Sequence, residues 1–410
     1  MSLFVLIFIF LVILSIFSSR DIFSPAKIYI SILFVFFGEV LFYQSASLEF
    51  NLVILIVYTF ALLLIILEFL GLKVDLKSDK YLPIKKTSIV RRLWLLTIVP
   101  LVAQYILIAE MGGLSGYLIS ITERVYAWKG YGIYLMLIRL ISVISYFYFA
   151  QLIISKPDFK GKLLFAFHFC IFVALALLSG SRSMLLWNIV YMVILHHYLV
   201  KRVTYKYATI IFLMVISSAM VLGTLRDSFS VDESGFSSGV DFEKNVLNMS
   251  NFSYGTKPIE LLISLDDEYE IELGSTYLTV FTNLIPRSIW PGKPDPGGII
   301  FTRDILGDPF GGFSYYSTGL FGEAFINFGL EFGSIFALLL FSFLYYLYFI
   351  YISIMNKQGT VFQISIYPFL LLGLPAYLYA EFTTNTLSIL FFKISLFYFV
   401  YKFTTVRFKF

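Results

Sequence analysis

Apolar runs long enough to cross about 30 Å of hydrocarbon alternate with short polar segments along most of the chain. Eleven runs stand out, at residues 2–18, 28–43, 51–72, 93–110, 133–154, 163–179, 184–200, 207–225, 333–352, 361–380 and 386–402. This pattern predicts an all-α polytopic membrane protein with about 11 transmembrane helices, within a range of 10–12.

The division between the sixth and seventh runs depends on one short polar segment. Residues 163–200 are almost continuously apolar, and a helix of that length would measure roughly 57 Å, far more than one bilayer. The chain must therefore break, and residues 179–183, with the sequence SGSRS, are the polar place at which it can do so.

Composition excludes a soluble globular protein. Hydrophobic residues make up 59% of the chain and charged residues only 14%, whereas about a quarter of an average soluble chain is charged. The single cysteine, Cys170, excludes an intrachain disulfide and a cysteine-rich metal site. No phosphate-binding glycine loop or nucleic-acid module is present, so we expect no cofactor, no metal and no nucleic-acid partner.

The distribution of Lys and Arg predicts the topology. When the loops are placed alternately inside and outside, nineteen Lys and Arg residues fall on one side and three in short loops on the other. Because short cytoplasmic loops hold the excess positive charge, the N-terminus is expected outside and the C-terminus in the cytoplasm. The first run has no basic start or cleavage site, so we interpret it as a retained helix.

The predicted helices and the long loop divide the chain into three segments. Residues 1–225 are expected to form an N-terminal bundle of about 8 helices, residues 226–319 a large external loop with short helices and irregular turns, and residues 320–410 the C-terminal transmembrane helices. Glycines crowd residues 319–333, which predicts an interfacial half-helix before the next span. The alternative is that the Gly329 to Gly333 spacing is a helix-packing pattern.

Cationic side chains recur on the predicted outer face: Arg182, Arg226, Arg287, Lys293 and Arg303. The planar guanidinium fork matches phosphate oxygens, so these residues are candidates to hold a lipid-linked phosphate or diphosphate. The alternative is that each is an interfacial anchor or a member of a local ion pair. Local pairing is favoured for Arg226 and Arg303, because each precedes an aspartate.

A second group of candidates comes from the helices and aromatic residues. Arg139 lies several residues inside the fifth predicted span, where a charge indicates function unless it snorkels to the interface. Glu323 and Asn327 are four residues apart and share a helical face, and Glu323 could accept a proton from a sugar hydroxyl. Its alternative role is to cap a helix. Trp290 and Tyr316 are aromatic candidates for substrate binding in the same loop region.

Two strings together resemble a known family. They are GSTYLTVFTNLIPRSIWPGKPDPGGIIFTRD and STGLFGEAFINFG, with SGSRS at a short turn upstream. In combination they resemble the Wzy-type O-antigen (oligosaccharide repeat-unit) polymerases of bacteria, which are GT-C-like membrane glycosyltransferases. The resemblance covers roughly residues 274–333 and 178–183; elsewhere only the helix count and the single large loop correspond.

The resemblance implies a multi-pass enzyme of the bacterial cytoplasmic (inner) membrane that joins oligosaccharide repeat units linked to undecaprenyl diphosphate on the outer face. Glu323, Arg287 and Arg182 are then the expected catalytic residues. Expected substrate-binding residues are Arg139, Arg226, Lys293, Arg303, Trp290, Asn327 and Tyr316. Candidate protein partners are a chain-length regulator and a flippase. The competing functions are an O-antigen ligase, a transporter of lipid-linked oligosaccharide, and a scaffold subunit.

Overall fold

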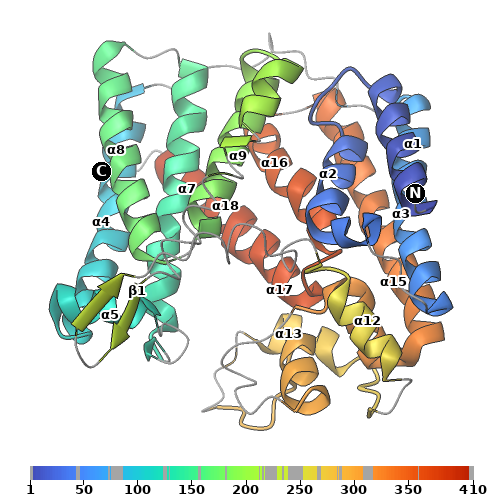
Figure 1. The fold of residues 1–410 in the computed structure, drawn as a ribbon. Helices are drawn as coiled ribbons and strands as arrows, with labels where there is room; N and C mark the ends of the chain where they lie inside the picture. Colours follow the sequence, from blue (N-terminus) through green and yellow to red (C-terminus); the bar gives the residue numbers. More distant parts are fainter. Residues whose placement is uncertain are drawn as a thin grey trace. The chain divides into compact units, whose positions relative to one another are not determined.

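The chain folds into helices in a computed structural model (Figure 1). The structure describes residues 3–42, 47–72, 74, 86–122, 127–128, 130–155, 158–180, 182–211, 213–214, 217, 229–232, 235–238, 253–265, 269–283, 285, 289–307, 317–358 and 360–405. One short antiparallel hairpin, β1 (Phe229–Asp232) with β2 (Gly235–Ser238), places Phe229 opposite Ser238. The predicted helical class is confirmed.

The chain divides into two compact units, each discontinuous in sequence. Unit 1 comprises Met1–Asp75, Met249–Gln358 and Phe369–Phe391, and unit 2 comprises Leu76–Asn248, Gly359–Pro368 and Phe392–Phe410. Each unit therefore takes residues from more than one of the three segments expected from sequence.

Unit 1 combines apolar helices from both ends of the chain with the short helices of the long loop. Its elements are α1 (Leu3–Ser18), α2 (Pro25–Phe37), the 3-10 turn η1 (Gly38–Leu41), α3 (Leu48–Phe69), α12 (Lys257–Ser264), α13 (Ser275–Thr282), α14 (Gly297–Ile299), the π-helical η4 (Ile300–Ile305), α15 (Gly319–Gln358) and α17 (Phe382–Leu387). Within this unit α12 contacts α3 and α15, and α13 contacts α15 and α17.

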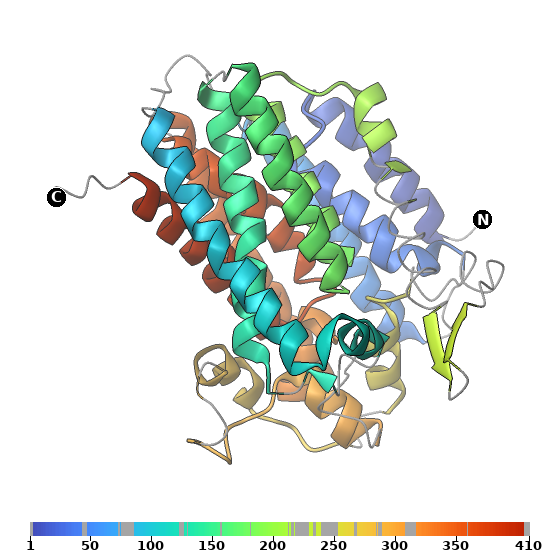
Figure 2. The same ribbon diagram turned by 90° about the vertical axis from the view of Figure 1, so that its left-hand side faces the viewer.

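Unit 2 is a bundle in which α7 is central. Its elements are α4 (Lys86–Glu110), α5 (Gly113–Thr122), α7 (Gly132–Ser155), α8 (Phe159–Leu178), α9 (Arg182–Leu199) and α18 (Leu396–Thr405). Helix α7 packs against α4, α8, α9 and α18, and Figure 2 shows α4, α7 and α8 side by side. Two stretches, α16 (Val361–Ala376) and the π-helical η5 (Ser388–Ser395), run from one unit into the other.

The chain is a membrane protein by the length and apolarity of its helices. Within the described residues six helices are long and apolar enough to span a bilayer: Leu48–Phe69, Ile89–Glu110, Gly132–Ser155, Phe159–Leu178, Gly319–Lys357 and Phe382–Thr405. Shorter apolar helices cover Leu3–Ser18, Ser183–Leu199 and Val361–Ala376. Most of the predicted run 207–225 lies outside the described residues. The number eleven and the outer placement of the long loop stay predictions.

Two breaks expected from sequence are present. Helix α8 ends at Leu178, Gly180 adopts φ 61°, and α9 begins at Arg182, so the chain turns within residues 179–183. Helix α15 is interrupted at Gly329, where φ 72° and ψ 177° are not helical. A Cβ atom on Gly333 would lie 2.6 Å from the carbonyl oxygen of Ala324, so the glycine permits the two parts of α15 to approach closely.

Candidate functional site

Glu323 is the centre of a buried hydrogen-bond network in unit 1. Its side chain is fully buried on the first part of α15. One carboxylate oxygen, Oε1, accepts a hydrogen bond of 2.9 Å from the Thr276 hydroxyl, and Oε2 accepts one of 2.6 Å from the backbone amide of Phe382. Phe382 is the first residue of α17. Glu323 therefore does cap a helix, but the helix is α17 and not its own.

Asn327 completes the network one turn further along α15. Its Nδ2 donates to the Thr276 hydroxyl oxygen at 2.7 Å and to the Glu323 carbonyl at 2.6 Å. Its Oδ1 accepts a hydrogen bond of 2.9 Å from the amide of Gly274. The prediction that Glu323 and Asn327 share a face is confirmed, and both side chains meet at Thr276 on α13.

The start of α13 is anchored to the end of the first part of α15. The amide of Leu273 donates to the Asn327 carbonyl at 3.0 Å. Leu273 and Gly274 have φ values of 48° and 92°, and left-handed backbone is unfavourable for leucine. The backbone bonds to α15 hold this strained turn and thereby fix the position of Thr276 beside Glu323.

A glycine-rich turn covers Glu323. Gly297 is buried at the start of α14, and a Cβ atom there would lie 3.1 Å from Cγ of Glu323. Larger residues would thus press on the carboxylate side chain. The turn that carries the PGG sequence lies directly against the buried acid because glycine leaves room for it.

Glu381 supplies a second buried carboxyl group, which sequence reasoning missed. It is fully buried at the N-cap position of α17, and its side chain does not cap that helix. Its Oε2 accepts a hydrogen bond of 3.1 Å from Thr384, whereas Oε1 has no hydrogen-bond partner among the described residues. The available signal was an acid in a short turn between the last two predicted spans, on the same predicted side as the long loop.

The electrostatic environment favours the neutral form of Glu381. Burial, followed by the negative charge of Glu323, raises the pKa of the Glu381 carboxyl from 4.5 to about 8, and the hydrogen bond from Thr384 opposes the shift. Burial and the same Glu323 charge also raise the pKa of the Tyr277 hydroxyl well above its usual value. Two buried carboxyl groups that interact this way titrate as a pair.

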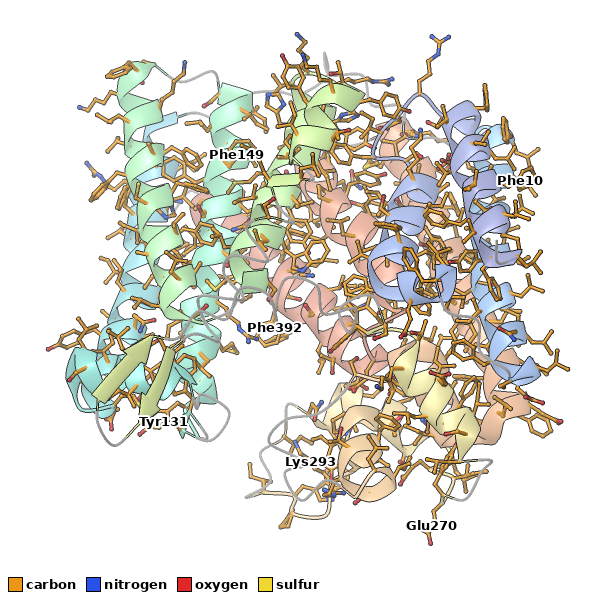
Figure 3. The ribbon with its side chains drawn as sticks, in the orientation of Figure 1. Phe10, Tyr131, Phe149, Glu270, Lys293 and Phe392 are labelled. Atoms are coloured by element: carbon orange, nitrogen blue, oxygen red, sulfur yellow. The ribbon has the colours of Figure 1, made fainter. Side chains whose placement is uncertain are left out.

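Two of the predicted cationic residues of the loop, Lys293 and Arg303, are engaged in local contacts. Lys293 donates to the carbonyl oxygens of Ile285 at 2.9 Å and Thr282 at 3.4 Å, and Figure 3 shows it among the turns that follow α13. Arg303 pairs with Asp304 at 2.6 Å and Asp295 at 3.0 Å, and the hydrogen bonds that its guanidinium donates to Asp304 are the main cause of its raised pKa. The ion-pair alternative for Arg303 is thus what the structure contains.

Of the other predicted residues, Trp290 is 43% exposed in the same loop. Arg139 is exposed on α7 in unit 2, and Arg182 begins α9 there, with a side chain outside the described set. Residues Arg226, Arg287 and Tyr316 also lie outside the described residues. Within the described ranges, no group of three or more His, Cys, Asp or Glu side chains gathers as metal ligands do.

Comparisons of the chain with protein-family models, with curated proteins and with solved structures gave no match. The functional interpretation therefore depends on the residues themselves. The buried network offers an acid that can hold a proton near neutral pH next to a carboxylate, beneath a glycine-rich turn.

Proposed function

We propose that this protein is a membrane glycosyltransferase that polymerises oligosaccharide repeat units linked to undecaprenyl diphosphate on the outer face of the bacterial cytoplasmic membrane. One observation carries the proposal. The two strings that resemble the polymerases, one holding Thr276 and Gly297 and the other Glu323, meet at the Glu323 side chain. Shared motifs that converge on one titratable group are the arrangement expected of a reaction centre.

The proposed reaction joins the growing glycan to a new repeat unit. The acceptor hydroxyl oxygen forms a bond with the anomeric carbon of the donor glycan, and the bond from that carbon to the diphosphate oxygen breaks. The bonding electrons leave with undecaprenyl diphosphate, and the hydroxyl proton passes to Glu323. Arg182 and Arg287 would stabilise the negative charge that develops on the leaving diphosphate.

Glu381 supports this chemistry by remaining neutral. With a pKa of about 8, Glu381 is mostly protonated near neutral pH and adds no second negative charge beside Glu323. A base is most effective when its proton affinity suits the working pH. Because Glu323 is fully buried and Gly297 lies against its side chain, an acceptor hydroxyl reaches the carboxylate only after a local rearrangement.

The decisive assay is polymerisation in vitro by the purified protein, with a lipid-linked repeat unit as both donor and acceptor. Arg287→Ala and Arg182→Ala are expected to lose most of the activity, and the Lys variants to fail nearly as badly, because the fork geometry is lost. Arg20→Ala, in a predicted cytoplasmic loop, is the matched control. Full polymer length with both alanine variants would exclude the diphosphate role of these residues.

The outer placement has its own test. A cysteine introduced by Ser181→Cys is expected to react with a membrane-impermeant thiol reagent in intact spheroplasts, because the charge distribution puts residues 179–183 outside. Labelling only after permeabilisation would reverse the topology and remove the role of Arg182. A Cys170→Ser background removes the single native thiol.

A transporter of lipid-linked oligosaccharide is the second candidate. Helix α15 is interrupted at Gly329, and α17 begins at a buried carboxylate; discontinuous helices of this kind occur in transporters. Glycan length in a deletion strain separates the functions. Loss of a polymerase leaves single capped repeats, loss of a transporter leaves none, and loss of a ligase leaves polymer on its carrier. Loss of a scaffold changes only the length distribution.

A further inference from the structure

We propose that unit 2 carries a binding site for an anionic phospholipid, separate from the buried carboxyl pair and independent of the proposed polymerase activity. The site is a cavity of about 510 Å³ between α7, α8, α9 and the chain that follows α9. This volume falls within the range of about 300–1,000 Å³ that is typical of small-molecule sites.

The walls of the cavity are apolar. Phe149 of α7 and Phe169 of α8 face Ile189 and Val193 of α9, and Figure 3 labels Phe149 on the α7 side. From Ile189 to His196 the cavity follows α9 over roughly 10 Å of helix. An elongated apolar groove of this kind, parallel to a helix in a membrane protein, suits an acyl chain.

The mouth of the cavity is basic. Lys201 and Arg202 line it and are exposed, and His196 lies beside them, half-buried. Neither Lys201 nor Arg202 forms an ion pair with another residue that the structure describes. Cations at the end of an apolar groove complement a phosphate headgroup above its acyl chain, and basic pockets between helices bind anionic lipids in this way.

The basic turn is held in place by a buried histidine. The ring nitrogen Nδ1 of His197 accepts a hydrogen bond of 2.9 Å from the amide of Val203, and His197 is only 3% exposed. The amide of Lys201 donates to the His196 carbonyl at 3.2 Å. These bonds fix the backbone that carries Lys201 and Arg202, so the points from which both side chains extend are set before a lipid binds.

A second apolar groove in unit 1 provides an internal comparison. It measures about 380 Å³ between α3 and α15, with Leu64, Tyr345 and Ile350 among its lining residues, and no charged residue lines it. We expect that groove to accept acyl chains without regard to headgroup charge. Only the groove in unit 2 should discriminate between anionic and zwitterionic lipids.

Native mass spectrometry of the full-length protein in neutral detergent tests the site, with phosphatidylglycerol and phosphatidylcholine as probes. The wild-type protein should retain phosphatidylglycerol preferentially. The double variant Lys201→Ala/Arg202→Ala should bind it roughly tenfold to thirtyfold more weakly, since each cation near the membrane surface contributes to anionic lipid binding. Lys160→Ala/Lys162→Ala makes the same change of charge at exposed positions on α8 and should retain wild-type binding.

Two further measurements separate the contribution of the acyl chain to binding from that of the headgroup. Val193→Trp fills the groove without changing charge and should abolish the preference, whereas Ser342→Trp, which fills the groove of unit 1, should leave it intact. Inorganic phosphate at millimolar concentration should not displace the lipid. The proposal is overturned if the two lipids bind equally to the wild type, if phosphate alone competes fully, or if both the double variant and Val193→Trp bind as the wild type does.

Discussion

Two buried glutamates in unit 1, Glu68 and Glu323, perform the same structural task in different surroundings. Glu68 is 1% exposed at the end of α3, and its carboxylate accepts hydrogen bonds from the Ser18 hydroxyl at 2.7 Å and the Ala26 amide at 2.8 Å. Ala26 belongs to the first turn of α2, whose own N-cap residue, Ser24, makes no capping bond. Each glutamate thus caps a helix from a distance and replaces an N-cap side chain that does not do so.

The two sites differ in what lies beside the cap. Lys27 near the Glu68 site donates to the carbonyl oxygens of Ser19 and Asp21, whereas Glu381 places a second buried carboxyl near Glu323. Capping explains why a carboxylate is buried at both sites. It does not explain the second acid, and the tests below ask whether the Glu323 region has the role that we propose for it.

The largest expected difference is in catalytic rate. Glu323→Gln keeps the size and the hydrogen-bond acceptor for the Phe382 amide but cannot take up a proton, so polymerisation in vitro should fall by about 10² to 10⁴. Glu68→Gln, the matched change at the other cap, should leave the rate within about twofold of wild type, because no reacting group is removed. A Glu323→Gln rate within about threefold of wild type, at equal expression, would make Glu323 purely structural.

The second difference concerns the pH dependence of stability. The pKa of Glu381 is about 8 in the folded protein and 4.5 for an ordinary glutamate. Between these values the unfolded chain releases a proton that the folded chain keeps, so wild-type stability should fall as the pH rises from about 4.5 to 8. Glu381→Gln should flatten this slope and be more stable than wild type at pH 8, by a few kcal/mol at most.

Thermal unfolding in detergent, recorded at several pH values, measures that slope. The wild-type protein, measured over the same pH range, gives the reference slope. If Glu381→Gln and wild type lose stability in parallel from pH 5 to 8, the Glu381 carboxyl is ionised in the folded protein and the proposed pair does not share a proton.

A third comparison removes the Glu68 carboxylate, which caps α2. Glu68→Ala leaves the Ala26 amide unpaired and creates a small cavity, and we expect it to lower the free energy of unfolding by about 2 kcal/mol. The Ser18 hydroxyl retains the Ser15 carbonyl as an acceptor, at 3.1 Å, which limits the loss. Chemical denaturation in mixed micelles would measure the effect, and polymerisation per folded molecule should be unchanged.

The smallest effects are expected when a hydroxyl group that donates a hydrogen bond to either carboxylate is removed. Ser18→Ala removes one donor to Glu68 and should cost about 1 kcal/mol. Thr276→Val removes a donor to Glu323 and an acceptor for Asn327, so it should cost about 2 kcal/mol. Equal losses in the two variants would show that the Asn327 bond contributes nothing and that the two caps are energetically alike.

The parts of this region that sequence predicted are local ones. The helical spacing of Glu323 and Asn327, the break near Gly329 and the turn at residues 179–183 each follow from neighbouring residues, and all are present. The bonds from Thr276 and Phe382 to Glu323 join residues 47 and 59 positions apart. No period or motif in the sequence encodes such pairings, and Glu381 was missed for the same reason.

For the cations of the loop, too, sequence predicts only contacts between neighbouring residues. Arg303 could be expected to pair locally because Asp304 is its neighbour, whereas the additional bond to Asp295 depends on the path of the turn between them. Lys293 carries no such signal in its sequence, and its contacts with the carbonyl oxygens of Thr282 and Ile285 follow from how the loop folds back.

The discontinuity of unit 1 has a consequence for the order in which the protein is made. The chain leaves this unit at Asp75, returns at Met249, and supplies the capped helix α17 only from Phe382 onward. Between Asp75 and Phe382 a ribosome adds roughly 300 residues, which takes on the order of 15 to 60 s at about 5–20 residues per second. Throughout that interval α1 to α3 lack the later helices of their unit, and Glu323 is synthesised before the amide that it caps. Biogenesis of unit 1 is therefore completed only when translation is nearly over, and truncation before Phe382 would leave the Glu323 carboxylate without one of its two donors.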